Sequence, residues 1–231
     1  MSRVTYDAGN LTIEVDGLDT VAAALGDLKK KTPAAAKVAI NATARQARKL
    51  MIAKAKARYA VNAAGRRHLK DLVQRKKASN TSLSAELHIA KMRNDLGYFQ
   101  HRPTERFTGR EVLHHAPKYV KARVLKASSM AALTGNANMS KGFLVEFKSG
   151  HVGMVQRQIG FSSGHTVTER GHPRWRNKAG KVEKLVTMGS PSASAMHSTV
   201  WPMVEPEVSE YLQDRLMEQT ERVLARAARR K

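Results

Sequence analysis

Histidines are the first residues of this sequence to suggest a metal or catalytic site, because there are nine of them. The closest groups are His114 with His115 and His165 with His172, and neither follows HExxH or a comparable ligand spacing. Neighbouring side chains on a strand point to opposite faces, so adjacent histidines rarely share one ion. We therefore expect no metal site.

Patterns for other catalytic chemistry are missing from the sequence as well. It has no GxSxG nucleophile elbow and neither of the glycine-rich loops, GxGxxG and GxxxxGK[ST], that cradle nucleotide phosphates. Nucleases hold their metal ions with clustered carboxylates, yet Asp71 is the one acidic residue between residues 33 and 80. We expect a protein that is not an enzyme and that carries no cofactor.

Positive charge is the chemistry that the sequence offers in quantity. There are 41 lysines and arginines against 19 aspartates and glutamates, a formal net charge of +22. Thirteen of these basic residues fall between residues 33 and 80, whereas residues 1–32 and 202–231 are close to charge balance. Such a field attracts nucleic acid or an acidic protein. A solvated basic face is the alternative interpretation.

Two groups of basic residues are candidates for contact with DNA or with an acidic partner. The first is formed by the Ala-rich segment and the following run RRHLKDLVQRKK, which can neutralise phosphates or remain a solvated face. In the second, a tryptophan between two arginines can stack on a base or anchor its own loop. The candidates are Arg45, Arg48, Lys49, Lys56, Arg66, Arg67, Lys70, Arg75, Lys76, Lys77, Arg174, Trp175 and Arg176.

The Ala-rich segment predicts a long helix over residues 33–58. It contains no glycine or internal proline, Pro33 suits the first helical position, and Thr32 suits the N-cap. Its apolar stripe is built largely of alanine, and its basic residues lie on another side. A second basic helix is predicted over residues 65–77, with Leu69, Leu72 and Val73 as its apolar anchor.

The rest of the chain alternates strands with polar connections. Period-two alternation predicts strands over residues 11–15, 83–89 and 118–126, and one starting at residue 181. A weak helix is predicted over residues 18–31 and an amphipathic C-terminal helix over residues 205–229. Turn-forming residues predict loops or arms at residues 93–116 and 127–141 and turns at 190–196.

The run GFLVEFKSGHVGMVQR, residues 142–157, predicts a β-hairpin. A two-residue loop at Ser149-Gly150 pairs Phe147 with Val152 and Val145 with Met154. The face that results is apolar and carries the hairpin core: Phe143, Val145, Phe147, Val152 and Met154. Because an isolated hairpin is marginally stable in water, this face must pack on another element. We expect the long Ala-rich helix to cover it.

The overall composition indicates a soluble protein. The 231 residues suit one α+β domain spanning 1–231, with an antiparallel sheet packed on the long N-terminal helix and the C-terminal helix on its flank. Without cysteine there are no disulfides, which suits a reducing compartment. The opening residues lack the apolar run of a signal peptide, and no segment is apolar for long enough to span a membrane.

The order of these elements resembles the minor tail protein Z family of long-tailed bacteriophages and prophages, also called tail completion or neck proteins. The resemblance covers roughly residues 33–225 and is strongest at Ala39-Ile40-Asn41, at Gly150–Arg157 and from Lys184-Leu185 to Met196. The chain departs from the family's GPS motif with Gly189-Ser190-Pro191-Ser192, and residues 91–140 have no clear counterpart.

The resemblance implies a structural protein of the virion, assembled in the cytoplasm of the bacterial host. Family members act at the head–tail junction, beside the tail terminator and the head-completion or connector proteins, where the DNA end is positioned for ejection. They resemble subunits of a homo-oligomeric ring, sixfold at this level, so the hairpin and the terminal helix become candidate ring contacts. Two alternatives stay open: a free DNA- or RNA-binding protein, and a tail assembly chaperone that finished particles lack.

Overall fold

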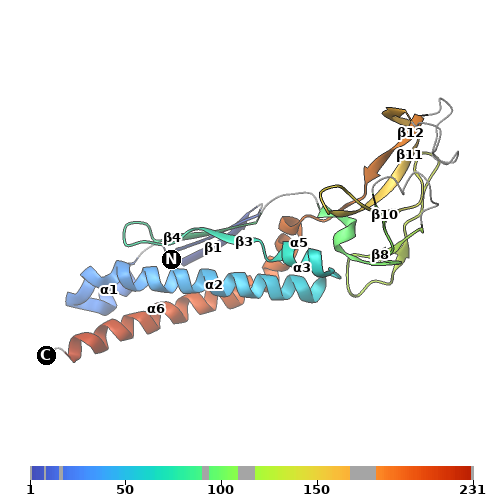
Figure 1. Ribbon diagram of the computed structural model, residues 1–231. Helices are drawn as coiled ribbons and strands as arrows, with labels where there is room; N and C mark the ends of the chain where they lie inside the picture. Colours follow the sequence, from blue (N-terminus) through green and yellow to red (C-terminus); the bar gives the residue numbers. More distant parts are fainter. Residues whose placement is uncertain are drawn as a thin grey trace. The chain divides into compact units, whose positions relative to one another are not determined.

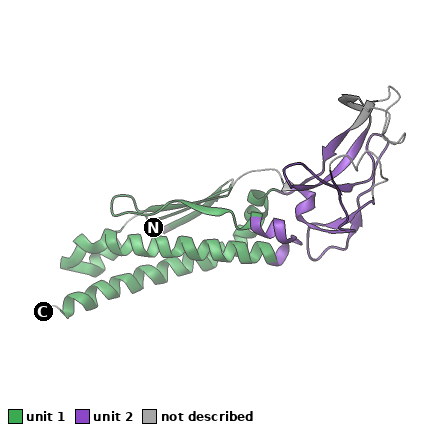
Figure 2. Ribbon diagram, in the orientation of Figure 1, with its two compact units in different colours: residues 1–56, 68–92, 192–231 green, residues 57–67, 93–191 purple. Residues whose placement is uncertain are grey.

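The computed structural model describes residues 2–7, 9–15, 18–89, 94–108, 118–166 and 181–229. The chain divides into two compact units, which are described separately (Figures 1 and 2). Unit 1 comprises residues 1–56, 68–92 and 192–231, and unit 2 comprises residues 57–67 and 93–191. That residues 1–231 act as one domain stays a prediction.

Unit 1 contains a four-stranded antiparallel sheet in the order β1-β2-β4-β3. Its strands are β1 (Ser2–Asp7), β2 (Asn10–Val15), β3 (Leu72–Lys76) and β4 (Ser84–Ile89). Side chains on β2 and β4 alternate between buried and partly exposed, as the period of two requires. The predicted strands at 11–15 and 83–89 are therefore confirmed.

The helices of unit 1 lie on one side of this sheet (Figure 1). The chain passes from α1 (Asp19–Leu25) through a 3₁₀ turn, η1 (Gly26–Lys31), into α2 (Thr32–Arg58). Thr32 is already helical and buried, and its hydroxyl makes no hydrogen bond to the described residues, so the predicted N-cap is wrong. The long helix itself is confirmed, and its buried alanines allow close packing.

The C-terminal part of unit 1 is largely helical from Ala193 to Ala228. It consists of α5 (Ala193–Val200), the 3₁₀ turn η4 (Trp201–Met203) and α6 (Glu205–Ala228). Ser192 caps α5, because its hydroxyl accepts the Ala195 N–H at 3.1 Å. The turns predicted at 190–196 are thus corrected in part, since the same serines that favour turns also favour N-caps. The predicted terminal helix is confirmed.

The second basic helix, predicted over 65–77, is wrong for its second half. Helix α3 (Ala63–Leu69) ends early, and the chain continues as strand β3. Leu72 is fully buried whereas Val73 is 59% exposed, which is the alternation of a strand rather than the anchor of a helix. Pairing with β4, from Leu72↔Ile89 onward, outweighs the helix propensity of the basic run.

Unit 2 is built from short strands. Its largest sheet has the order β12-β11-β10-β7, in which β10 pairs with β7 in parallel and the other pairs are antiparallel. Two smaller sheets are β6-β8-β9 and β13-β5. The elements are β5 (Asn94–Asp95), η2 (Leu96–Tyr98), β6 (Gln100–Arg102), β7 (Phe107–Thr108), β8 (Lys121–Arg123), β9 (Ala131–Ala132), β10 (Phe143–Glu146), β11 (Val152–Thr166), β12 (Lys181–Thr187) and β13 (Gly189–Ser190).

The segments predicted as loops or arms therefore carry short strands. Residues 94–108 contain β5, η2, β6 and β7, and residues 109–116 of the predicted arm lie outside the described residues. Residues 127–141 contain β9 and an isolated bridge between Asn136 and Met139. Two- and three-residue strands leave no usable periodicity, so the sequence pattern could not reveal them.

The predicted hairpin exists, but its register is shifted by one residue. Val145 pairs with Gly153, not Met154. The Phe147 N–H donates to the His151 carbonyl at 2.8 Å, and Gly150 closes the loop at φ 76°. The loop thus has three residues ending in a left-handed glycine, a common alternative to the two-residue turn.

This shift redistributes the predicted hairpin core between two faces. Phe143, Val145 and Phe147 share one face, while Val152 and Met154 lie on the opposite face. The first face packs with Val155, Phe107 and Leu185, all within unit 2. The sequence predicts that the Ala-rich helix covers this face. Residues 32–56 of that helix belong to unit 1, so they are not among the residues that pack on this face within unit 2. The overall fold class, α+β with antiparallel pairing, a long helix and a C-terminal helix, is confirmed.

Candidate basic interface

Helix α2 and the edge strand β3 are joined by side chains of α2. The Arg48 Nε donates to the Leu72 carbonyl at 2.6 Å, and its Nη2 donates to the Lys70 carbonyl at 2.9 Å. Two helical turns earlier, the Asn41 amide accepts the Ala78 N–H and donates to the Ala78 carbonyl, both at 3.0 Å. The side chains of Asn41 and Arg48 therefore satisfy main-chain groups along β3 and its two ends that the sheet leaves open.

These bonds bring together basic residues that are far apart in the sequence. Arg45 and Lys49 are exposed on α2 and Lys56 is half-buried, while Lys70 and Arg75 are exposed in the segment that α2 holds. We call this group of residues, on α2 and on the segment that α2 holds, the basic edge. It comprises Arg45, Arg48, Lys49, Lys56, Lys70, Arg75, Lys76 and Lys77.

Most cations of the basic edge have no counter-charge in the described part of the chain. Arg48 is used by the backbone bonds above, and Lys76 lies 3.5 Å from the Glu86 carboxylate. For the other members, the described residues provide no ion pair. Exposed cations that repel one another favour an anionic partner, either phosphate or carboxylate.

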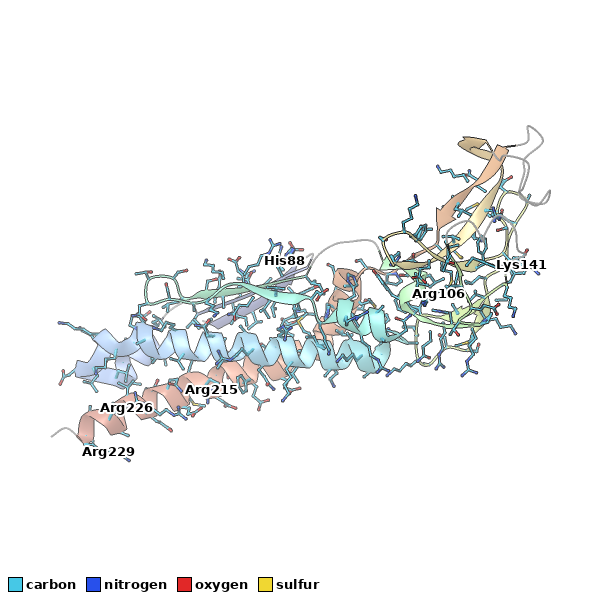
Figure 3. The ribbon with its side chains drawn as sticks, in the orientation of Figure 1. His88, Arg106, Lys141, Arg215, Arg226 and Arg229 are labelled. Atoms are coloured by element: carbon cyan, nitrogen blue, oxygen red, sulfur yellow. The ribbon has the colours of Figure 1, made fainter. Side chains whose placement is uncertain are left out.

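Three basic residues of unit 2 have a partner within that unit. Arg106 lies 2.6 Å from Glu146, and Lys118 lies 2.5 Å from Glu105. The Lys141 ammonium lies 5.4 Å from the ring centroid of Tyr119. Figure 3 labels Arg106 and Lys141 in unit 2. Other exposed basic residues of unit 2, such as Arg102, Lys121 and Lys148, have no ion pair among the described residues, so unmatched positive charge occurs in both units.

The remaining candidates are not part of the basic edge. Arg66 and Arg67 are exposed on α3 but belong to unit 2, where the Asn62 side chain accepts the Gly65 N–H at 3.0 Å and fixes the start of that helix. Arg174, Trp175 and Arg176 lie outside the described residues. The sequence interpretation of the Trp175 loop therefore stays a prediction.

A second polar cluster lies in unit 2 around the buried Asp95 carboxylate. Its Oδ1 accepts the N–H groups of Gly97 at 2.7 Å and Met154 at 2.8 Å, and its Oδ2 lies 3.1 Å from the His151 Nε2. The His151 ring stacks on Phe147, with a centroid separation of 6.0 Å. An aspartate–histidine pair resembles part of a catalytic triad. Here the carboxylate is occupied in holding the hairpin to the residue 95–97 turn.

The run Gly150–Arg157, in which the sequence predicts the strongest family resemblance, supplies the turn glycine and the second strand of this hairpin. Gly150 supplies the left-handed turn residue, and a Cβ on Gly153 would lie 2.6 Å from the Asp95 Oδ2. Gln156 donates to the Ser140 carbonyl at 2.9 Å. Arg157 is 1% exposed and lies with its guanidinium carbon 5.4 Å from the Phe143 centroid. The polar groups of this run thus hold the hairpin to neighbouring segments of unit 2.

His197 is the one fully buried histidine among the described residues. Its Nε2 donates to the Leu69 carbonyl at 3.1 Å. Burial lowers the pKa of His197 to about 4, opposed by the bond to Leu69 and reinforced by nearby His68. His197 is therefore neutral at physiological pH and ties α5 to the end of α3.

Metal ligation and membrane insertion find no support in the described residues. Within those ranges, no three histidine or carboxylate side chains come together as metal ligands. His114, His115 and His172 lie outside the described residues, and the His165 side chain is not described either. No described helix combines the length and apolar character that a membrane crossing requires.

Sequence patterns missed two residues that matter most for these sites. Asn41 entered only through the resemblance, and Asp95 lies in a segment predicted to be a loop. Nothing local marks either residue, because their partners are distant in the sequence: Ala78 for Asn41, and Met154 for Asp95.

Comparison with protein-family models, with curated proteins and with solved structures gives no match.

Proposed function

We propose that this protein is a non-enzymatic structural component of a tailed-phage virion, a neck or tail-completion protein at the head–tail junction. It would form a sixfold ring of copies that helps join the tail to the head and position the DNA end. Its neighbours would be the tail terminator and the head-completion or connector proteins. Localisation in the virion, after assembly in the host cytoplasm, belongs to the same proposal.

The observation that carries this proposal is the use of the run Gly150–Arg157. The family resemblance is strongest there, and its polar side chains hold the hairpin to neighbouring segments of unit 2: His151 contacts Asp95, and Gln156 donates to the Ser140 carbonyl. Arg157 packs against Phe143 of the hairpin itself. A motif that serves to hold a sheet together suits a building block whose outer surfaces contact neighbours. It does not suit a catalytic centre, which needs reactive groups open to substrate.

The basic edge gives this building block a contact surface. Its unmatched cations suit the phosphates of the DNA end or the carboxylates of an adjoining protein. Contacts to phosphate carry no sequence information, which agrees with a protein that must hold whatever sequence ends the genome. The charge therefore supports a positioning role rather than sequence recognition.

The proposal is tested by deleting the gene from its phage or prophage. Particles are counted by electron microscopy, infectivity is scored in parallel, and purified wild-type virions are analysed by mass spectrometry. We expect the protein in virions, and we expect full heads with unjoined or normal-looking tails and lost infectivity in the deletion. Normal infectious yield from the deletion would overturn the proposal.

A free DNA- or RNA-binding protein is the second candidate, because the same unmatched cations favour it. It would bind nucleic acid tightly in a salt-sensitive manner and would not enter virions. A tail assembly chaperone would be needed for infectivity yet be absent from finished particles. Mass spectrometry of virions separates both alternatives from the neck assignment.

A further inference from the structure

Helix α6 carries an exposed acidic stripe. Glu207, Glu210, Asp214 and Glu221 are all exposed and follow one another at spacings of three, four and seven residues. Residues at these spacings lie on one side of a helix. Met217 and Leu224, which are 59% and 40% exposed, continue the same pattern. We define these six residues as the acidic stripe.

The acidic stripe does not face the core of its own unit. Val208 and Leu212, which are fully buried, lie on a different side of α6. The basic residues Arg215 and Arg222 both pair with Glu218 rather than with members of the stripe. Figure 3 shows Arg215 and Arg226 along α6. Among the described ion pairs, none engages the four acids of the stripe.

Helix α2 carries a stripe of the opposite charge. Arg45, Lys49 and Lys56 follow Val38 at spacings of seven, four and seven residues, so all four lie on one side of the helix. Val38 is 41% exposed. We define these four residues as the basic stripe; Arg45, Lys49 and Lys56 are also members of the basic edge. At 1.5 Å per residue, each stripe is about 26 Å long.

We infer that the two stripes bind each other between copies of this chain, with the acidic stripe of one copy on the basic stripe of the next. The stripes have opposite charge and nearly equal length. Each includes exposed apolar surface that can leave water on contact, Val38 on the basic stripe and Met217 with Leu224 on the acidic stripe. This inference rests on the proposed function, because it names a partner for part of the basic edge.

A second copy explains both stripes, whereas a nucleic acid explains one. Phosphate would bind the basic stripe but would be repelled by the four carboxylates of the acidic stripe. No described ion pair joins α2 to α6 within a copy, so both stripes remain available. Because the two patches differ, the contact is heterologous, and repeating it generates a closed ring or an open filament.

Charge reversal of each stripe provides the test. One variant carries Arg45→Glu, Lys49→Glu and Lys56→Glu, and another carries Glu210→Lys, Asp214→Lys and Glu221→Lys. A third variant combines all six changes. A control for the first variant, Lys121→Glu with Lys126→Glu and Lys148→Glu, makes the same change in net charge at exposed positions of unit 2. Thermal unfolding checks that each variant is folded.

Self-association of the purified full chain is measured by sedimentation velocity at low and high salt. We expect wild-type and control to associate, and each single-stripe variant to associate at least about tenfold more weakly. Association should recover in an equimolar mixture of the two single-stripe variants. It should also recover in the six-substitution variant by itself, because in both samples opposite charges again face each other.

Several results would overturn the inference. These are a wild-type chain that stays monomeric at low salt, or folded variants whose mixture fails to associate. A first variant that associates normally but loses salt-sensitive binding to a DNA duplex would assign the basic stripe to nucleic acid instead. Sedimentation requires no virion, so the two proposals can fail separately. If the variants associate as expected but the phage that lacks the gene has normal infectivity, the proposed function is refuted and the contact between copies stands.

Discussion

Removal of the Asp95 carboxylate is the sharpest test of how unit 2 is held together. Asp95 is 6% exposed, and one of its oxygens accepts two main-chain N–H groups, those of Gly97 at 2.7 Å and Met154 at 2.8 Å. Met154 lies on β11 of the hairpin, and Gly97 lies in η2. A single oxygen thus links two segments more than fifty residues apart in the sequence.

The expected cost follows from the donors left without an acceptor. In Asp95→Ala both N–H groups lose their partner in a buried site, at about 1–3 kcal/mol each, so the free energy of unfolding should fall by about 2–6 kcal/mol. Asp95→Asn keeps the accepting oxygen and loses the negative charge beside His151. Because the His151 side chain is 35% exposed, solvent screens that pair, and the loss should stay below about 1 kcal/mol.

Hydrogen exchange measures this effect where it acts. Exchange of the Gly97 and Met154 amides should accelerate strongly in Asp95→Ala and little in Asp95→Asn, with urea unfolding as a global measurement. Amides of β2 and β4 in unit 1 serve as the internal control. If Asp95→Ala left the Met154 amide as protected as in wild-type, the claim that Asp95 holds the hairpin would be refuted.

Three further predictions concern the other structural residues. Burial holds the pKa of His197 at about 4 in the folded chain, against an ordinary value of 6.5, so between these pH values the unfolded chain binds a proton that the folded chain does not. The free energy of unfolding should therefore fall by about 3 kcal/mol as the pH drops from 6.5 to 4. In His197→Gln, which keeps a donor for the Leu69 carbonyl, urea titrations at several pH values should no longer show this part of the pH dependence. Gly150 has a φ of 76°, and a Cβ added there would meet nothing within 4 Å, so only backbone strain opposes a side chain at this position. Gly150→Val should lower the free energy of unfolding by about 1–2 kcal/mol, and Gly150→Asn clearly less, because asparagine tolerates the left-handed region. Equal losses in thermal unfolding would contradict this explanation. Asn41→Leu should lower the free energy of unfolding by about 1–3 kcal/mol and speed hydrogen exchange at the Ala78 amide. Asn41→Asp keeps the acceptor for that amide and should leave it protected. If exchange in Asn41→Leu did not change, Asn41 would not hold the edge strand.

The candidate site was only partly open to prediction. The charge excess between residues 33 and 80 directed attention to α2 and the segment after it, and helical spacing placed Arg45, Arg48, Lys49 and Lys56 on one side. That these residues contact DNA or an acidic partner stays a prediction. Which basic residues have counter-charges was not predictable, because Glu86 and Glu146 are far in the sequence from Lys76 and Arg106. The same reason separated Arg48, whose guanidinium binds two carbonyls, from its neighbours on α2.

Errors in the fold prediction have one common origin. Residues 72–76 read locally as part of a basic helix, yet they pair with β4 as an edge strand. The hairpin took a three-residue loop in place of a two-residue loop, because Gly150 can serve as the left-handed residue of either. In both cases two local structures of similar free energy compete, and contacts with distant residues decide between them.

By itself, the sequence determined whatever depends on neighbouring residues: the long α2 helix from its alanines, the terminal α6 helix from its period, and the strands β2 and β4 from their alternation. Tertiary structure alone decided that residues 72–76 form strand β3 and which register the hairpin adopts. It also decided that Asp95 anchors the hairpin and that Asn41 and Arg48 hydrogen-bond α2 to the edge strand. The physical reason is that propensity and periodicity act within a few residues, whereas a buried hydrogen bond selects its partner by position in space.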